Sequence, residues 1–163
     1  MATTKFNLPI EAAWPGASAI PALINTAGTN FPVPGWSFTI ASSHAIYWHF
    51  VIQGYGSGNL SLKLHWYASG GQTTGNVRWD ASISAVTSGD AQSIESDAFA
   101  TATNTTTTVN GTAKGVTATT VTISNLDSIA DQDRVTLKLV TNSAGTLGSN
   151  PVLLEAWLEF SDT

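Results

Sequence analysis

The three histidines of this chain all lie in one stretch of sequence, so the first question is whether they could bind a metal ion. A metal site built from His44, His49 and His65 would place His49 and a residue of a neighbouring strand beside a carboxylate. His65, however, alternates with Lys63 and Tyr67 on a face that points to solvent, and His49 fits a hydrogen-bonded histidine of the core. We therefore expect no metal site among the histidines.

A second cluster of possible ligands is acidic. Asp127, Asp131 and Asp133 lie in one loop, and loops rich in oxygen ligands can hold Ca²⁺. The loop lacks the alternating ligands and the twelfth-position glutamate of an EF-hand. Aspartate is also common in turns because its carboxylate accepts hydrogen bonds from nearby backbone N–H groups. We expect these three carboxylates to stabilise a turn.

Catalysis finds no support in the remaining residues. The eleven acidic residues fall mostly at strand ends and in loops, and no pair of them stands out as a general acid and base. The sequence contains no phosphate-binding loop, no dinucleotide fingerprint and no nucleophile elbow. We therefore expect a protein that is not an enzyme, with no catalytic residue, no metal and no cofactor.

Composition narrows the classes of partner. Six basic against eleven acidic residues give a net charge of -5, which argues against nucleic acid. No run approaches the roughly 20 apolar residues of a membrane helix. Cysteine is absent, so stability must come from packing, and the N-terminus lacks the apolar core of a secretory signal. We expect no membrane partner and no export of the chain.

The first 35 residues differ in character from the rest of the chain. Five of the six prolines lie between Pro9 and Pro34, and this spacing excludes a long helix or a regular central strand. We expect an extended arm over residues 1–35 and a β-domain over residues 36–163. The arm either covers a sheet edge of its own domain or lies across a neighbouring subunit.

Alternating hydrophobicity predicts strands throughout the second part. Residues 59–67 and 76–86 alternate cleanly around a glycine-rich turn, and we expect them to form a hairpin. Its expected register has three cross-strand pairs: Trp66–Val77, Leu64–Trp79 and Lys63–Asp80. The segment 44–53 is apolar on both faces, so we expect a central strand with both faces covered.

Further strands are expected over residues 94–109, 116–124, 133–141 and 152–160, and Asn110-Gly111 is a two-residue turn signal. The count is about eight strands, with no helical period sustained anywhere. The fold class is therefore all-β, best fitted by a two-sheet antiparallel sandwich of jelly-roll type with an extended proline-rich N-terminal arm. An immunoglobulin-like sandwich is the close alternative.

Aromatic side chains are the remaining functional clue. Trp48, Trp66 and Trp79 fall on inward faces, so we expect them in the core. Trp157 alternates with Glu155 and Glu159 on the non-core face of the last strand, where a large aromatic side chain is typical of an interface. The interface candidates are Trp14, Phe31, Trp36, Tyr47, Tyr67 and Trp157.

Two segments carry a resemblance to a known group of proteins. Leu60-Ser-Leu-Lys-Leu-His-Trp-Tyr-Ala-Ser, followed by Thr74-Gly-Asn-Val-Arg-Trp-Asp, resembles a pattern of tailed-bacteriophage virion proteins. The Asp-rich loop, Arg134-Val-Thr-Leu-Lys-Leu and the final Leu-Glu-Ala-Trp-Leu-Glu-Phe extend the resemblance to about Tyr47–Phe160. The proline-rich arm departs from the pattern.

The resemblance implies a jelly-roll structural protein of the virion, typically a homotrimer. It would be a capsid decoration or cement protein that binds the major capsid protein on the outer surface of the phage head and stabilises the shell. The alternative is a receptor-binding, glycan-binding module of a phage tail fibre or spike. A third interpretation is a stand-alone carbohydrate-binding module or lectin, whose tryptophan fluorescence glycans would quench.

Overall fold

The computed structural model describes residues 3–40 and 43–162, and within them the chain forms eleven β-strands, one 3-10 turn and no α-helix. Six strands form the first sheet: β1 (Thr3–Leu8), β3 (Ala22–Thr26), β4 (Val33–Ser37), β6 (Ser57–Ala68), β9 (Thr117–Ile123) and β11 (Pro151–Ser161). Five form the second: β2 (Trp14–Pro15), β5 (Ala45–Val51), β7 (Asn76–Val86), β8 (Thr103–Thr108) and β10 (Arg134–Asn142). The 3-10 turn η1 (Ile10–Ala12) joins β1 to β2.

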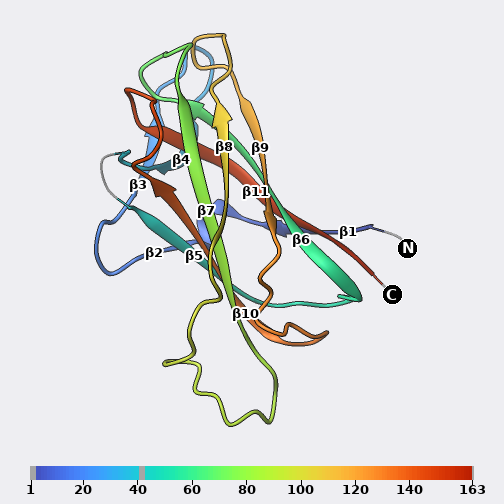
Figure 1. The fold of residues 1–163 in the computed structure, drawn as a ribbon. Coiled ribbons are helices and arrows are strands. Elements are labelled where there is room, and N and C mark those ends of the chain that lie inside the picture. The colour runs from blue at the N-terminus through green and yellow to red at the C-terminus, as the bar shows by residue number, and fades with distance from the viewer. Residues whose placement is uncertain (1–2, 41–42, 163) are drawn as a thin grey trace.

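The strands of both sheets pair antiparallel, and the sheets pack face to face as a sandwich (Figure 1). The six-stranded sheet runs β3-β4-β11-β6-β9, with β1 also paired to β11, and the five-stranded sheet runs β2-β5-β10-β7-β8. The predicted all-β, two-sheet sandwich is confirmed. In the described part of the chain, no helix has the length and apolar character needed to cross a membrane.

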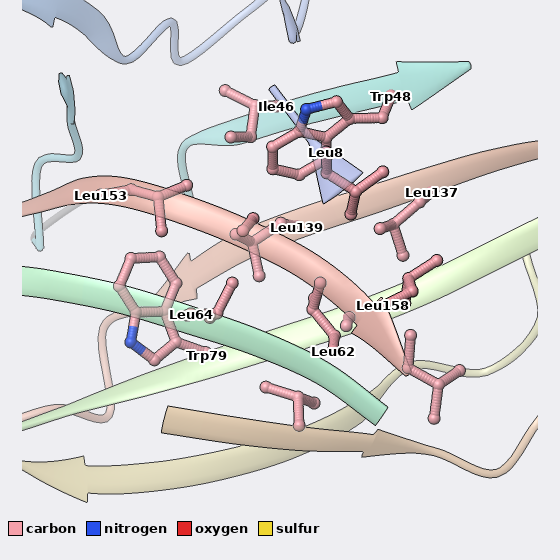
Figure 2. Packing of buried hydrophobic residues seen from close by; sticks show 14 of the residues in the cluster. Leu8, Ile46, Trp48, Leu62, Leu64, Trp79, Leu137, Leu139, Leu153 and Leu158 are labelled. Carbon is pink, nitrogen blue, oxygen red and sulfur yellow. The ribbon is translucent and has the colours of Figure 1, made fainter. Parts of the chain in front are cut away.

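The core lies between the two sheets, where the inward side chains of each strand meet those of the facing sheet (Figure 2). Leu137 and Leu139 of β10 are fully buried, as are Leu62 and Leu64 of β6. Burial of such side chains is the main favourable term in the stability of a cysteine-free domain. The predicted inward faces of these strands are therefore confirmed.

The three tryptophans expected in the core are there. Trp48, Trp66 and Trp79 are at most 2% exposed, and the rings of Trp66 and Trp79 meet edge to face with their centroids 6.1 Å apart. Trp66 belongs to β6 and Trp79 to β7, so this contact joins the two sheets.

The predicted hairpin register is wrong, because β6 and β7 do not pair. β6 lies between β11 and β9 in one sheet, and β7 lies between β10 and β8 in the other. Alternation identifies the buried face of each strand. Two strands with matching alternation can be neighbours in one sheet, or they can belong to different sheets and face each other across the core. The cross-strand pairs Trp66–Val77, Leu64–Trp79 and Lys63–Asp80 are therefore absent: Lys63 lies 3.6 Å from Glu159, and Asp80 lies 2.8 Å from Arg78.

Residues 3–35 of the expected arm lie in the same sandwich. β1 pairs with β11, β2 pairs with β5, and the β3–β4 hairpin joins β11 through β4. These contacts correspond to the first of the two arrangements considered above, in which the segment covers sheet edges of its own domain. Residues 1 and 2 of the arm lie outside the described residues.

Three local expectations also need correction. The outer face of β5 is not covered along its length, since His49 and Val51 are exposed; His49 is thus not a core residue, and its Nδ1 lies 3.1 Å from the Thr136 hydroxyl oxygen. Asn110-Gly111 is not a two-residue hairpin, because β8 and β9 belong to different sheets and a longer loop links them.

The third correction concerns β11, whose alternation is interrupted by a register shift between Leu153 and Glu155. Leu153, Ala156 and Leu158 all face the core, so inward positions are odd before the shift and even after it. A β-bulge of this kind adds one residue to a strand and reverses the faces beyond it. Simple alternation over residues 152–160, with Trp157 outward, predicts that Val152 faces inward and Leu153 outward, and the shift reverses both.

Candidate functional site

A groove lies on the outer face of the six-stranded sheet, where β11 changes its partner on one edge. β4 pairs with β11 at Val152 and Leu153, and β1 takes over at Ala156. Leu154 and Glu155 lie in the gap between these partners, beside the register shift of β11. The groove above the gap has a volume of about 540 Å³, and Pro9, Ile10 and Glu11, which follow β1, are part of its lining.

Trp157 forms one wall of this groove and is held in place from three sides. Its indole N–H donates a hydrogen bond of 2.9 Å to Glu159 Oε1. The ammonium group of Lys5 lies 4.3 Å from the ring centroid, and the His65 ring meets it edge to face at 5.0 Å. These contacts fix the orientation of a half-buried ring and reduce the entropy that Trp157 would lose on binding a ligand.

The charges around Trp157 balance one another. His65 Nδ1 lies 3.0 Å from Glu155 Oε2, and Lys63 Nζ lies 3.6 Å from Glu159 Oε2. The indole N–H of Trp157 is the largest cause that holds the pKa of Glu159 below its ordinary value, and Lys63 and Lys5 lower the pKa further. The groove therefore offers fixed donors and acceptors with little net charge.

A second, apolar hollow of about 300 Å³ adjoins the groove, and Leu154 lines both. Phe31 and Tyr67 contribute aromatic rings to it, and Lys114 is the charged residue in its lining. The Tyr67 hydroxyl oxygen lies 2.8 Å from Thr26 Oγ1, which fixes the tyrosine against the β3–β4 hairpin.

The interface candidates of the sequence are distributed over several places. Trp157 lines the groove, and Phe31 and Tyr67 line the second hollow, although Tyr67 is mostly buried. Trp14 is 68% exposed on β2, away from both, and Tyr47 packs against Phe99 with ring centroids 6.0 Å apart.

Trp36 is placed differently from the expectation. It is only 7% exposed, and its indole N–H donates a hydrogen bond of 2.7 Å to the carbonyl oxygen of Ile10. Trp36 lies directly opposite Leu153 of β11, which faces the core, so the Trp36 side chain points to the same side. Trp36 is therefore a core residue and not a surface contact.

Among the groove residues that the sequence did not single out as a site are two charged ones, Lys5 and Glu11. Lys5 and Glu11 lie in the segment expected to be an arm, and no local pattern linked them to Trp157. The pairing of Lys5 with Glu159 on β11 brings the first of them to the ring.

All three carboxylates of the Asp-rich loop accept backbone hydrogen bonds, but only Asp133 does so within its own turn, as predicted; Asp131 and Asp127 bond other segments of the chain. Asp131 Oδ1 accepts hydrogen bonds from the N–H groups of Gly54 and Tyr55, and Asp127 Oδ2 accepts one from Ala85 N–H. Asp133 Oδ2 accepts one of 2.7 Å from Ala130 N–H. Among residues 3–40 and 43–162, no group of three or more histidine, cysteine, aspartate or glutamate side chains is arranged to hold a metal ion.

Comparison with known proteins relates the chain to others by fold. No protein-family model matches it, and no curated protein matches it in sequence. Among solved structures, the CBM36-1 domain of a multidomain xylanase from the hindgut metagenome of Trinervitermes trinervoides is 14% identical, with a TM-score of 0.53 over 99% of both chains. The CBM28 module, described as specific for non-crystalline cellulose, is 10% identical, with a TM-score of 0.58 over 93% of this chain and 89% of its own.

A third similar structure is the family 11 carbohydrate-binding module of Clostridium thermocellum, in complex with a β-1,3-1,4-mixed-linked tetrasaccharide. It is 10% identical, with a TM-score of 0.51 over 97% of this chain and 96% of its own. The fold is therefore a jelly-roll sandwich of the kind found in carbohydrate-binding modules, and the predicted jelly roll is confirmed. The expected virion role stays a prediction.

Proposed function

We propose that this chain is a non-catalytic glycan-binding module that holds a sugar chain in the groove beside Trp157. The observation that carries the proposal is a fixed aromatic ring in the wall of an open groove. The apolar face of a pyranose ring packs on such a surface, and the flanking polar groups bond the hydroxyls.

The composition of the groove favours a neutral glycan. Lys5 and His65 supply donors, while Glu11 and Glu155 supply acceptors, so no single sign of charge dominates the lining. The chain as a whole has a net charge of -5, which repels sulfated or uronic-acid polymers. Structural neighbours that bind cellulose and mixed-linked glucan support neutral β-glucans as the first ligands to test.

The test is affinity electrophoresis in gels that contain one neutral polysaccharide each: mixed-linked glucan, hydroxyethyl cellulose, xylan or a galactan. Retardation of the wild-type chain by at least one polymer supports the proposal, and no retardation by any of them contradicts it. Trp157→Ala should abolish the retardation. Trp14→Ala is the matched control, because Trp14 is exposed and lies outside the groove.

A second candidate function is attachment to a phage shell, which the resemblance to virion proteins implies. The observation that favours it is the exposure of Trp14 and Phe31, each 68% accessible. Truncation of the first 30 residues is unsuitable as a test, because β1 and β3 belong to the sandwich. Co-sedimentation of the wild-type chain and of a Trp14→Ala, Phe31→Ala variant with empty phage shells tests it, and equal sedimentation of both contradicts a role for these side chains.

A further inference from the structure

One lateral edge of the sandwich is built from a segment without charged side chains. Between Glu11 and Lys63 the sequence contains no Asp, Glu, Lys or Arg. This segment supplies β2, β3, β4 and β5, which lie together on one side of the molecule (Figure 1). β3 is the outermost strand of the six-stranded sheet there, and β2 is the outermost strand of the five-stranded sheet.

Within its five residues, the edge strand β3 has none of the usual protection against pairing with another chain, although Pro21 directly precedes it. Natural edge strands carry charged side chains, prolines or bulges that prevent further strand addition. The five residues of β3, Ala22–Thr26, include no charge and no proline. Leu23 is 55% exposed, and Ile20, just before the strand, is 56% exposed.

The backbone of β3 presents a regular set of free groups at this edge. Directly after β4, Phe38 N–H donates a hydrogen bond to the carbonyl oxygen of Pro151, and Trp36, two residues earlier, pairs with Leu153. Alternate residues of β4, including Pro34 and Trp36, therefore direct their backbone toward β11. Leu23 and Asn25 lie opposite Trp36 and Pro34. In an antiparallel ladder, paired residues direct their backbone groups either both toward or both away from each other. The N–H and C=O groups of Leu23 and Asn25 therefore point outward.

We propose that β3 pairs antiparallel with β3 of a second copy of this chain, about a two-fold axis at Ile24. In this register Leu23 exchanges two backbone hydrogen bonds with Asn25 of the partner subunit, and the same pair repeats across the axis. All four outward groups of each strand are then satisfied. Ile24 meets Ile24 of the partner subunit as a non-hydrogen-bonded pair, in which side chains approach most closely.

The distribution of charge favours a second copy of this chain as the partner of β3. Each copy has a net charge of -5, so two copies repel wherever their acidic surfaces meet. The segment between Glu11 and Lys63, which forms the β2–β5 edge, is the longest stretch of the sequence without Asp, Glu, Lys or Arg, so it adds no such charge to a contact between two copies. A two-fold contact is self-complementary and closes on itself, so it gives a dimer and no fibre. It differs from the trimer that the virion resemblance implies.

The two-fold axis of an antiparallel strand pair is perpendicular to the sheet, so the outer faces of both six-stranded sheets point the same way. The two grooves beside Trp157 therefore lie on the same side of the dimer. If each groove binds a glycan, as proposed above, both can contact one polysaccharide surface. Two linked sites bind a polymer more tightly than one because the second contact is intramolecular.

A cross-linking experiment tests the strand pairing without any glycan. The chain has no cysteine, so Ile24→Cys introduces one thiol per copy. In a non-hydrogen-bonded antiparallel pair the Cα atoms are roughly 4.5 Å apart, which lies within the range that disulfides span. Mild oxidation should convert most of this variant to a covalent dimer. Thr120→Cys is the control, since Thr120 is exposed on β9 at the opposite edge, and equal cross-linking of both variants would overturn the pairing.

Sedimentation equilibrium tests the same interface without a cysteine. The wild-type chain should have twice its monomer mass of 17.0 kDa, and Leu23→Lys should shift it to the monomer. Ile94→Lys, a matched change at an exposed apolar residue of the loop between β7 and β8, outside this edge, should remain a dimer. Circular dichroism checks that each variant is folded. A wild-type monomer or trimer would overturn the two-fold pairing, while the proposed glycan site would still be tested separately by affinity electrophoresis.

Discussion

The ammonium group of Lys5, in β1, lies 4.3 Å from the centroid of the Trp157 ring in β11. The contact follows from the register of the two strands, in which Lys5 is opposite Glu159 and Asn7 is opposite Trp157. A cation over an indole face contributes about 0.5–1 kcal/mol at an exposed site. The first strand of the chain thus fixes the one groove aromatic that the last strand supplies.

Acidification should weaken this arrangement through Glu159. The hydrogen bond from the Trp157 indole, followed by the charges of Lys63 and Lys5, holds the pKa of Glu159 below its ordinary value in the folded protein. Glu159 is therefore protonated at higher pH in the unfolded chain than in the folded protein. The stability that its carboxylate contributes to the fold is present above the ordinary glutamate pKa and is lost as pH falls through the pKa of the folded state. The difference in Tm between wild type and Glu159→Gln should be largest near neutral pH and vanish in acid. Parallel Tm profiles would contradict this.

Because β4 approaches β11 closely at Gly35, any side chain there should lower the stability of the fold. A Cβ atom on Gly35 would lie 2.6 Å from Val152 Cγ1 and 2.7 Å from the carbonyl oxygen of Leu153. Gly35→Ala should lower the free energy of unfolding by about 1–3 kcal/mol, the usual cost of overpacking. Gly111→Ala is the control, since a Cβ there meets no atom within 4 Å. Urea unfolding curves measure both, and an equal effect of the two changes would contradict the close approach.

Trp66 and Trp79, the two core tryptophans whose rings meet, should differ in their response to the same substitution. The indole N–H of Trp66 donates a hydrogen bond of 2.8 Å to Thr119 Oγ1, whereas the indole N–H of Trp79 has no protein acceptor. Trp66→Phe loses this bond and leaves a buried hydroxyl, so it should cost about 1 kcal/mol more than Trp79→Phe. Thermal or urea unfolding of both variants measures the difference, and a larger loss for Trp79→Phe would contradict it.

The sequence was informative about local structure because alternation depends only on which side of a strand is buried. Val135, Leu137 and Leu139 identify β10 and its inward face, and the structure confirms both. Trp157 was also placed correctly on the outer face, because Glu155 and Glu159 flank it at the same period.

Strand partners were not predictable in this way. Trp66 and Val77 have matching inward periods, yet their strands belong to opposite sheets, and the same pattern fits pairing within a sheet or packing across the core. The bulge after Leu153 escaped detection because one extra residue leaves no local composition signal. Lys5 escaped because its contact with Trp157 depends on pairing between the two ends of the chain.

The most direct test of the central claim follows the indole N–H resonances of the six tryptophans by ¹⁵N-¹H NMR while a neutral oligosaccharide, such as cellohexaose or the β-1,3-1,4-mixed-linked tetrasaccharide, is added. Trp157→Phe assigns the groove resonance. We predict a saturable shift of the Trp157 signal with little movement of the buried Trp48, Trp66 and Trp79 signals. No shift of Trp157 with any oligosaccharide bound by the chain, or a shift confined to Trp14, would contradict the groove as the glycan site.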